Sequence, residues 1–194
     1  MHFFIDLMSK TAENINVNPK GFIMESSEQK ILPEDILAKI LNSYVHYYMI
    51  KKDGVPAPFS AFAEFHSHNE QFVLVKKAKI ADNDSNEYVY FLLTEYLDVP
   101  VLTDAARKAW EDGLAKVKPS FTHRNSDVTL VAVANTFADG LEKAAKKIRF
   151  SKSYSFSFRG WSNFRLVCYE AQSKKFASNY HGKDLIKTFK RNGL

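Results

Sequence analysis

Two histidines with a glutamate on each side are the residues of this sequence best suited to chemistry. They recur at every second position of the stretch FAEFHSHNEQF, as Glu64, His66, His68 and Glu70. In a β-strand all four side chains project from one face, because the side-chain period is two. Imidazoles and carboxylates so placed can ligate a divalent metal such as zinc. The spacing predicts a metal site, to which His123 or Asp127 from a neighbouring element could add a ligand.

The same stretch has a plainer interpretation as the polar end of a strand. A turn at Ser67-His68-Asn69 would separate a strand over residues 58–67 from another over 71–81, and the histidines would then diverge. An H-x-H pair without a further ligand at fixed spacing is weak support for a metal site. We prefer the interpretation without a metal and expect no cofactor. A metal-dependent hydrolase or nuclease that uses the four residues is kept as the alternative.

A second group of candidate residues is basic and lies in the C-terminal third. Residues 141–194 contain 13 Lys/Arg and three Asp/Glu, whereas residues 1–140 contain 14 Lys/Arg and 19 Asp/Glu. Such an asymmetry indicates a binding protein with an anionic partner such as nucleic acid or another polyanion. The residues predicted to bind it are Lys143, Lys146, Lys147, Lys152, Arg159, Lys183, Lys187, Lys190 and Arg191. They form one phosphate-facing surface if the last helix packs beside the helix near Leu141.

Aromatic residues alternate with serine in the same region, within KKIRFSKSYSFSFRGWSNFR. The series Lys152, Tyr154, Phe156 and Phe158 loosely resembles the strand of RNA-binding sheets on which bases stack. A strand that turns its rings into the core produces the same alternation. We expect core packing for the rings and a role in binding for the basic side chains alone.

Several familiar chemistries are excluded. The seven glycines are scattered singly, so neither a P-loop nor a dinucleotide fingerprint can be built from them. RGWSNF lacks the last glycine of a nucleophile elbow. The run DNDSN at residues 82–86 lacks the later glycine and glutamate of a calcium loop, and we interpret it as a polar turn. Cys168 is the single cysteine, so no disulfide can form within the chain, and we expect its thiol to be buried.

The elements that position these residues follow an α+β order. Pro33 opens an amphipathic helix, and VTLVAVA at residues 128–134 is typical of a central strand buried on both faces. Thr103 is the expected N-cap of a second helix, and residues 154–158 and 163–170 are expected to form a hairpin. We predict a largely antiparallel or mixed sheet flanked by helices. This core domain covers residues 31–194, with residues 1–30 as an N-terminal appendage.

The sequence also bears on location and assembly. The N-terminal MHFFIDLMSK makes a poor signal peptide, and no apolar run reaches the ~18–20 residues needed to cross a bilayer. We expect a soluble, cytoplasmic protein without a membrane partner. A homodimer is compatible with the sequence, which does not identify the pairing face.

Four stretches together resemble a known group of proteins: AEFHSHNEQFVLVKKAKI, NEYVYF, VTLVAVA, and KKIRFSKSYSFSFRGWSNFRLVCYE followed by ASNYHGKDLIK. They are similar to an uncharacterised bacterial, Firmicutes-type family of unknown function, over about Tyr47 to Phe189. In that family an arginine commonly stands at the position of His68, which weakens the interpretation of H-x-H as a metal site. The resemblance carries no functional residue over to this chain.

Overall fold

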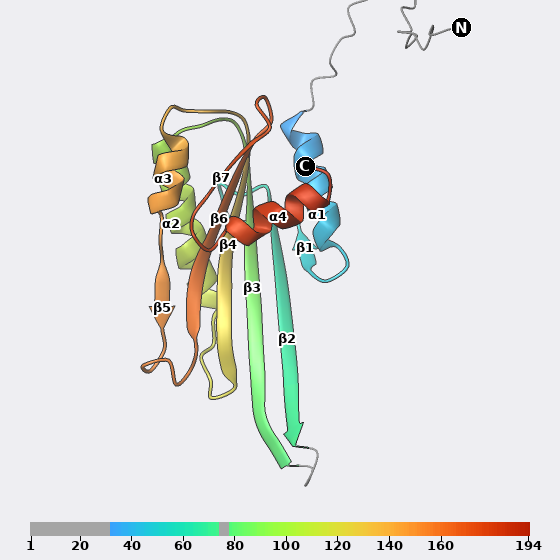
Figure 1. The fold of residues 1–194 in the computed structure, drawn as a ribbon, viewed down its shortest axis with the longest axis vertical. Coiled ribbons are helices and arrows are strands. Elements are labelled where there is room, and N and C mark those ends of the chain that lie inside the picture. The colour runs from blue at the N-terminus through green and yellow to red at the C-terminus, as the bar shows by residue number, and fades with distance from the viewer. Residues whose placement is uncertain (1–31, 74–77) are drawn as a thin grey trace, which may run out of the picture.

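The computed structural model describes residues 32–73 and 78–194, with the side chains of 68–73 and 78–83 outside the description. The appendage predicted over residues 1–30 lies outside the described residues. In chain order the elements are α1 (Pro33–Tyr44), β1 (Met49–Lys51), β2 (Ala61–Val73), β3 (Ala78–Leu97), α2 (Val99–Lys116), β4 (His123–Phe137), α3 (Leu141–Lys147), β5 (Ser151–Ser153), β6 (Trp161–Glu170), β7 (Lys175–Ser178) and α4 (Lys183–Arg191) (Figure 1).

The described strands form one mixed sheet in the order β1-β2-β3-β4-β6-β5, with β7 also paired to β6. Strands β1, β2 and β3 make an antiparallel meander. Strands β3, β4 and β6 are parallel, while β5 and β7 run antiparallel to β6. The predicted class is confirmed: the protein has an α+β fold with a mixed sheet flanked by helices in one core domain.

Helices cover both faces of the sheet. Helices α2 and α3 pack on the face that carries Tyr90, Leu130 and Leu166, and α1 and α4 pack on the face that carries Phe91 and Val131. Successive strand residues alternate between these two layers. In Figure 1, α4 crosses the upper part of the sheet, and no described helix lies in front of the strands below it. Within the described residues, no helix is both long and apolar enough to cross a membrane.

Two sequence predictions about the core are confirmed. Every residue of β4 from Val128 to Ala134 is buried, as expected of a strand with a helical layer on each side. The apolar stripe of α1 is buried as a whole against the sheet, and consists of Ile36, Leu37, Ile40, Leu41 and Tyr44.

Two predicted turns are wrong, because both polar stretches continue as strands. Strand β2 runs through residues 67–69, and β3 runs through residues 82–86. The two stretches pair with each other, for instance His66 with Asn86 and Ser67 with Ser85. Asn86 also pairs with Ser126 of β4. Because the ladders on both sides hold the polar residues extended, pairing overrides their local preference for turns.

Two other boundaries differ from the prediction. Helix α2 begins four residues before Thr103, since Asp98 is the N-cap and its carboxylate accepts a hydrogen bond of 2.8 Å from the Val101 N–H. The hairpin before β6 has only Ser151–Ser153 as its first strand. Residues 154–158, predicted as a strand, belong instead to the turn.

Gly113 offers a test of how α2 packs on β4. A methyl group at this position would lie 2.6 Å from Val128 Cγ2 and 2.8 Å from Cγ1. Because a β-branched side chain in a filled core cannot move aside, we expect Gly113→Ala to lower the free energy of unfolding by about 1–3 kcal/mol. Val128→Ala removes both clashing groups, so the double variant should be less destabilised than the sum of the two single variants in urea unfolding. If the losses of unfolding free energy in the two single variants simply add in the double variant, the contact between Gly113 and Val128 would be contradicted.

Candidate functional site

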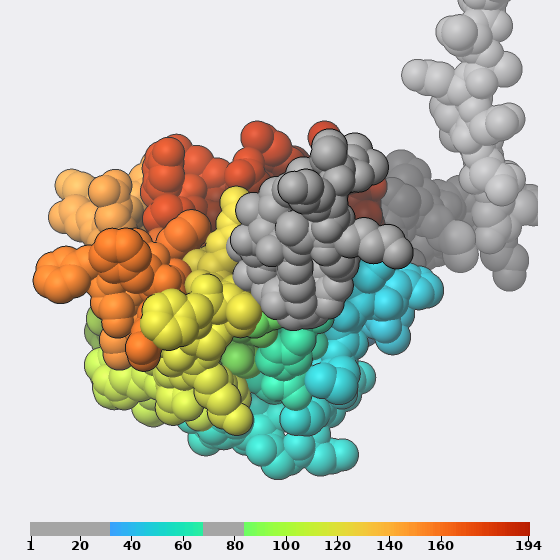
Figure 2. Space-filling view, turned by 90° about the horizontal axis from the view of Figure 1, so that it is seen from below, coloured from blue at the N-terminus to red at the C-terminus, as the bar shows by residue number. Residues whose placement is uncertain are grey.

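Aromatic side chains gather in solvent at the end of the sheet where the chain enters β4 and β6. Phe156 is 97% exposed, Phe121 83%, Phe158 80% and Trp161 41%. The prediction that Phe156 and Phe158 pack in the core is therefore wrong. Exposed basic residues come from the same two segments, and we call the whole group the aromatic–basic tip: Phe121, Phe156, Phe158, Trp161, Arg124, Lys152 and Arg159. Figure 2 shows this end, with the yellow start of β4 beside the orange segment before β6.

The loop that displays Phe156 and Phe158 is closed by its own backbone. Tyr154 N–H donates to the Gly160 carbonyl over 3.0 Å, and Arg159 N–H donates back to the Tyr154 carbonyl over 3.1 Å. Ser155, Phe156 and Ser157 have φ of 49°, 52° and 69°. Such left-handed conformations are uncommon for residues other than glycine, and each is energetically costly. The loop therefore holds the two rings outward at the expense of local backbone strain.

A cation–π contact and a histidine join the two segments of the tip. The Arg159 guanidinium lies 4.9 Å from the centre of the Phe121 ring. His123, the first residue of β4, is buried and bonds the Arg159 carbonyl through Nδ1 over 2.7 Å. Gly160 approaches the same residue so closely that a Cβ there would lie 2.6 Å from the His123 carbonyl oxygen. The loop is thus anchored directly to the start of β4.

A pocket of about 560 Å³ adjoins the tip on the face that α2 covers. Glu64 and His66 of β2 line it, together with Asp84 and Tyr88 of β3 and His123 of β4. Lys116 of α2 also lines it, as do Lys118 and Ser120 from the connection that leads to Phe121. The pocket and the tip therefore share the segment between α2 and β4.

A β-bulge turns His123 into this pocket. Between the pairs Asp84–His123 and Ser85–Asn125, β4 contains one residue more than β3. The extra residue reverses the side-chain alternation, so His123 joins the face of Asn86 while Asp127 projects from the opposite face. In a regular strand, residues four apart such as His123 and Asp127 would project from the same face, and the bulge puts them on opposite faces.

A chain of hydrogen bonds runs from the pocket to the aromatic loop, and a carbonyl sets its direction. Because the Arg159 carbonyl can only accept, His123 Nδ1 donates to it, and His123 Nε2 makes a second hydrogen bond of 2.8 Å with Ser126 Oγ. Ser126 Oγ accepts in turn from Asn86 Nδ2 over 3.1 Å. Asn86 Oδ1 accepts from His66 Nδ1 over 2.7 Å. Each side chain in this series of hydrogen bonds has its partners, so the series stabilises one arrangement of the pocket relative to the loop.

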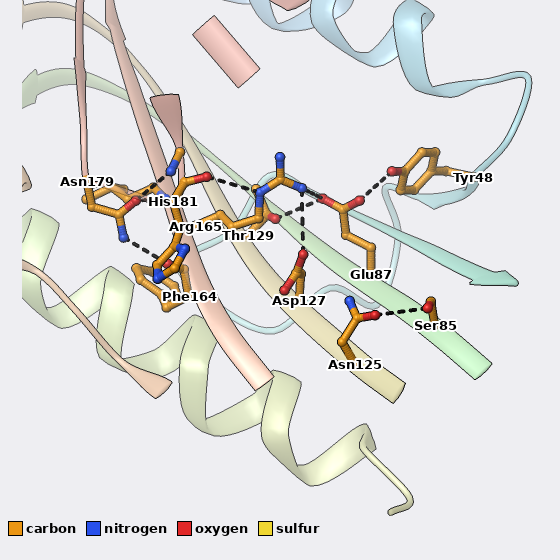
Figure 3. A network of polar contacts seen from close by, with 12 residues as sticks. Tyr48, Ser85, Glu87, Asn125, Asp127, Thr129, Phe164, Arg165, Asn179 and His181 are labelled. Atoms are coloured by element: carbon orange, nitrogen blue, oxygen red, sulfur yellow. Dashed lines mark hydrogen bonds and ion pairs between the residues drawn. The ribbon is translucent and has the colours of Figure 1, made fainter. Parts of the chain in front are cut away.

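The opposite face of the sheet carries a separate ion-pair network, shown in Figure 3. Glu87 accepts hydrogen bonds from Tyr48 Oη (2.6 Å), Thr129 Oγ1 (2.9 Å) and Arg165 Nη1 (3.1 Å). Arg165 Nη1 also lies 4.0 Å from Asp127 Oδ2. Burial and the Glu87 carboxylate raise the pKa of Tyr48, which remains a donor. Since Glu87 is satisfied within the protein, this network fits a role in joining β3, β4 and β6 to the α1–β1 connection.

The predicted metal ligands are only partly described. Glu64 Oε2 and His66 Nε2 lie 3.8 Å apart at the pocket, and Glu64 Oε1 also pairs with Lys51 Nζ at 3.0 Å. The side chains of His68 and Glu70 lie outside the described residues. In the described ranges, no group of three or more His, Cys, Asp and Glu side chains could hold a metal ion.

The nine predicted anion-binding residues fall into three groups. Lys143, Lys146 and Lys147 lie on α3, and Lys152 and Arg159 lie at the tip. The residues on α4, on the other face of the sheet, are Lys183, Lys187, Lys190 and Arg191. The condition that the last helix packs beside the helix near Leu141 is not met, because the two helices pack on opposite faces of the sheet.

Two further sequence features are resolved by the fold. Cys168 is buried as expected, and burial raises the pKa of its thiol, which disfavours the reactive thiolate. The exposure of Phe156 and Phe158 was missed, because period-two alternation does not distinguish a core strand from an exposed loop. The one signal available was the density of serine around the rings, since serine is common in turns.

Gly160 allows the anchoring of the loop to be tested against a matched glycine. Gly160→Ala introduces a positive-φ alanine and close contacts with the carbonyl oxygens of Arg124 and His123, whereas Gly140→Ala, at a similar φ of 81°, meets no atom within 4 Å. We expect Gly140→Ala to cost about 1 kcal/mol of unfolding free energy and Gly160→Ala clearly more, with faster amide exchange in residues 154–160. Equal costs would show that the contact with His123 does not constrain the loop.

Asp127 gives a pH-dependent prediction for the network. Burial raises the pKa of its carboxyl, against the opposing effect of Arg165. The folded state then binds the proton more tightly than the unfolded chain, so this carboxyl lowers stability as pH rises from about 4 through the folded-state pKa. We expect Asp127→Asn to gain stability over the wild type across that window in thermal melts, with no difference at lower pH.

The matched control for Asp127 is Asp104, whose carboxyl pKa is shifted in the opposite direction. Hydrogen bonds from Lys108 and Arg107 lower the pKa of the exposed Asp104 carboxyl. Its contribution to stability is therefore present above about pH 4 and lost as pH falls through the lowered pKa. Asp104→Asn should lose stability relative to the wild type at neutral pH. A loss at neutral pH for Asp127→Asn as well would contradict the assignment.

Comparison with known proteins gives one family and no function. Residues 33–191 match the family model described as a domain of unknown function (DUF8052). No curated protein and no solved structure matches the chain. The matched range runs from the first residue of α1 to the last residue of α4, so it contains the pocket and the tip. An uncharacterised family was expected from the sequence, and the chain belongs to the DUF8052 domain family.

Proposed function

We propose that this protein is a non-enzymatic binding protein that holds single-stranded nucleic acid at the aromatic–basic tip. The observation that carries the proposal is the exposure of Phe156 and Phe158 on a loop closed by its own hydrogen bonds. An exposed phenylalanine forgoes about 1.5–3 kcal/mol of burial. Because the loop also carries backbone strain, folding stability alone does not explain its shape.

Charge around the rings supports an anionic partner. Residues 118–125 and 152–161 contain four Lys/Arg and no Asp/Glu: Lys118, Arg124, Lys152 and Arg159. In proteins that bind single strands, bases stack on aromatic rings while cations meet the phosphates. A duplex hides the faces of its bases within the stack, so exposed rings beside cations favour a single strand.

The proposal keeps the anionic partner indicated by the charge of the C-terminal third and assigns the main contact to Lys152 and Arg159. On α4, Lys187 pairs with Asp184 at 3.1 Å. Lys183 and Lys190 lie 5.5 Å and 5.9 Å from the ring centres of Tyr180 and Phe176. These helical lysines would add long-range attraction rather than contacts with bases. The alternative of a metal-dependent hydrolase has less support, because the described residues include no third His, Cys, Asp or Glu side chain grouped with Glu64 and His66 to hold a metal ion.

Fluorescence anisotropy with a labelled RNA of about ten nucleotides tests the proposal. We expect binding to weaken steeply between about 50 and 200 mM salt, since phosphate contacts release counterions. Phe156→Ser with Phe158→Ser should weaken it further by about tenfold per ring, because each stacked base contributes about 1–3 kcal/mol. Double-stranded DNA of equal length should bind less tightly than the single strand.

The matched control is Tyr96→Ser, which removes a ring that is 55% exposed at the other end of β3. It should leave RNA binding unchanged. Anionic phospholipid vesicles serve as a second ligand, because exposed phenylalanines beside cations can also enter a membrane surface. Binding to vesicles without binding to RNA, or equal losses in the Tyr96 and Phe156/Phe158 variants, would refute the proposal.

A further inference from the structure

The pocket beside the tip is chemically different from the tip itself. Its wall carries the carboxylates of Glu64 and Asp84 as well as two lysines, Lys118 and Lys116, of which Lys116 is paired with Asp112 at 2.6 Å. The Thr122 hydroxyl donates to the Asp84 carboxylate. Glu64 uses Oε1 for Lys51, while Oε2 has His66 Nε2 as a neighbour at 3.8 Å. Carboxylates only accept hydrogen bonds and repel phosphate. An anionic strand at the tip would therefore offer this pocket a base rather than a phosphate.

The connection between α2 and β4 places the pocket within reach of such a strand. Lys118, Ser120 and His123 line the pocket. Phe121 and Arg124, from the same short segment, belong to the tip and are exposed. A nucleotide next to one stacked on Phe121 could thus keep its phosphate near Lys118, whose exposed side chain stands at the pocket wall. Its base could enter a volume of about 560 Å³, within the range of small-molecule sites.

We propose that the pocket reads one base of the bound strand by its exocyclic amino group, which the carboxylate of Glu64 accepts. Cytosine, adenine and guanine carry such a donor, and cytosine N4 is a known partner of Glu and Asp. Uracil has a single ring N–H between two carbonyl oxygens. These oxygens carry partial negative charge, so a carboxylate repels them. The pocket therefore prefers an amino base over uracil. This inference rests on the proposed function, because the tip must hold the strand.

The hydrogen-bond chain makes the pocket and the loop one unit. His66 bonds Asn86, and the chain continues through Ser126 to His123 and the Arg159 carbonyl. The walls of the pocket are therefore already ordered before a base enters. Such preorganisation reduces the entropy lost on binding and sharpens discrimination between bases.

The test compares oligouridine of about ten nucleotides with the same strand carrying one cytosine, by anisotropy at fixed salt. The two strands differ at one base: cytosine has an amino group where uracil has a carbonyl oxygen, and it lacks the proton on the neighbouring ring nitrogen. This comparison therefore needs no protein variant. We expect the cytosine strand to bind about tenfold more tightly. Glu64→Gln should reduce the ratio of affinities to about one, because the amide no longer repels the uracil oxygens and can donate a hydrogen bond to them.

The matched control is Glu142→Gln, which removes the same charge at an exposed position of α3 and should keep the preference. Thermal melts establish whether Glu64→Gln is folded. If it is not folded, the binding of the two strands by the wild-type protein alone tests the inference. Equal binding of the two strands by the wild type, or a preference that survives in folded Glu64→Gln, would overturn the inference and leave the proposed function standing. Failure of both strands to bind would instead refute the proposed function, and this inference with it.

Discussion

The parallel pairing of the buried strand β4 with β3 and β6 is the constraint on which the rest of the structure depends. Parallel neighbours all begin at the same end of the sheet, so each connection must return the chain over a helical layer. The connections that enter β4 and β6 therefore meet at that end. One supplies Phe121 and the other supplies Phe156 and Phe158, far apart in sequence, and the two meet where His123 bonds the Arg159 carbonyl. The aromatic–basic tip is thus a product of sheet topology.

The same topology explains why the strands are polar toward this end. Their pairing leaves rows of polar side chains beyond the apolar layers, and these side chains satisfy one another across the strands. On the face of α1 and α4, Ser85 bonds Asn125 and Glu87 bonds Thr129 and Arg165. On the face of α2, Asn86 bonds Ser126. Because the ladder places these partners opposite one another or two residues apart across the strands, these described polar side chains are satisfied within the sheet and the end remains strand.

Local patterns predicted the core well and the polar end of the sheet poorly. The stripe of α1 and the apolar run of β4 could be predicted because burial on one or both faces imposes a periodicity on a single segment. The continuation of β2 and β3 through their polar stretches could not, since it depends on a partner strand. The position of His123 depends on a one-residue bulge relative to β3, which no property of β4 alone reveals. Phe156 is exposed in a turn with positive φ values at non-glycine residues, for which the density of serine is the only signal that the sequence carries.

Sheets with parallel strands usually bind ligands at the carboxyl ends of the strands, at a point where successive connections diverge to opposite faces. In the described part of this fold both parallel connections, α2 and α3, lie on one face, so no such point exists between β3, β4 and β6. A hollow of about 430 Å³ does lie at the carboxyl ends of β4 and β6. Its Glu170 carboxylate already accepts hydrogen bonds from Phe137 N–H and the Ser173 hydroxyl. The amino ends instead bring together exposed rings, cations and a pocket with free acceptor capacity at Glu64 Oε2. For this arrangement of strands, the proposed binding site therefore lies at the amino ends of the parallel strands, where the entering loops converge.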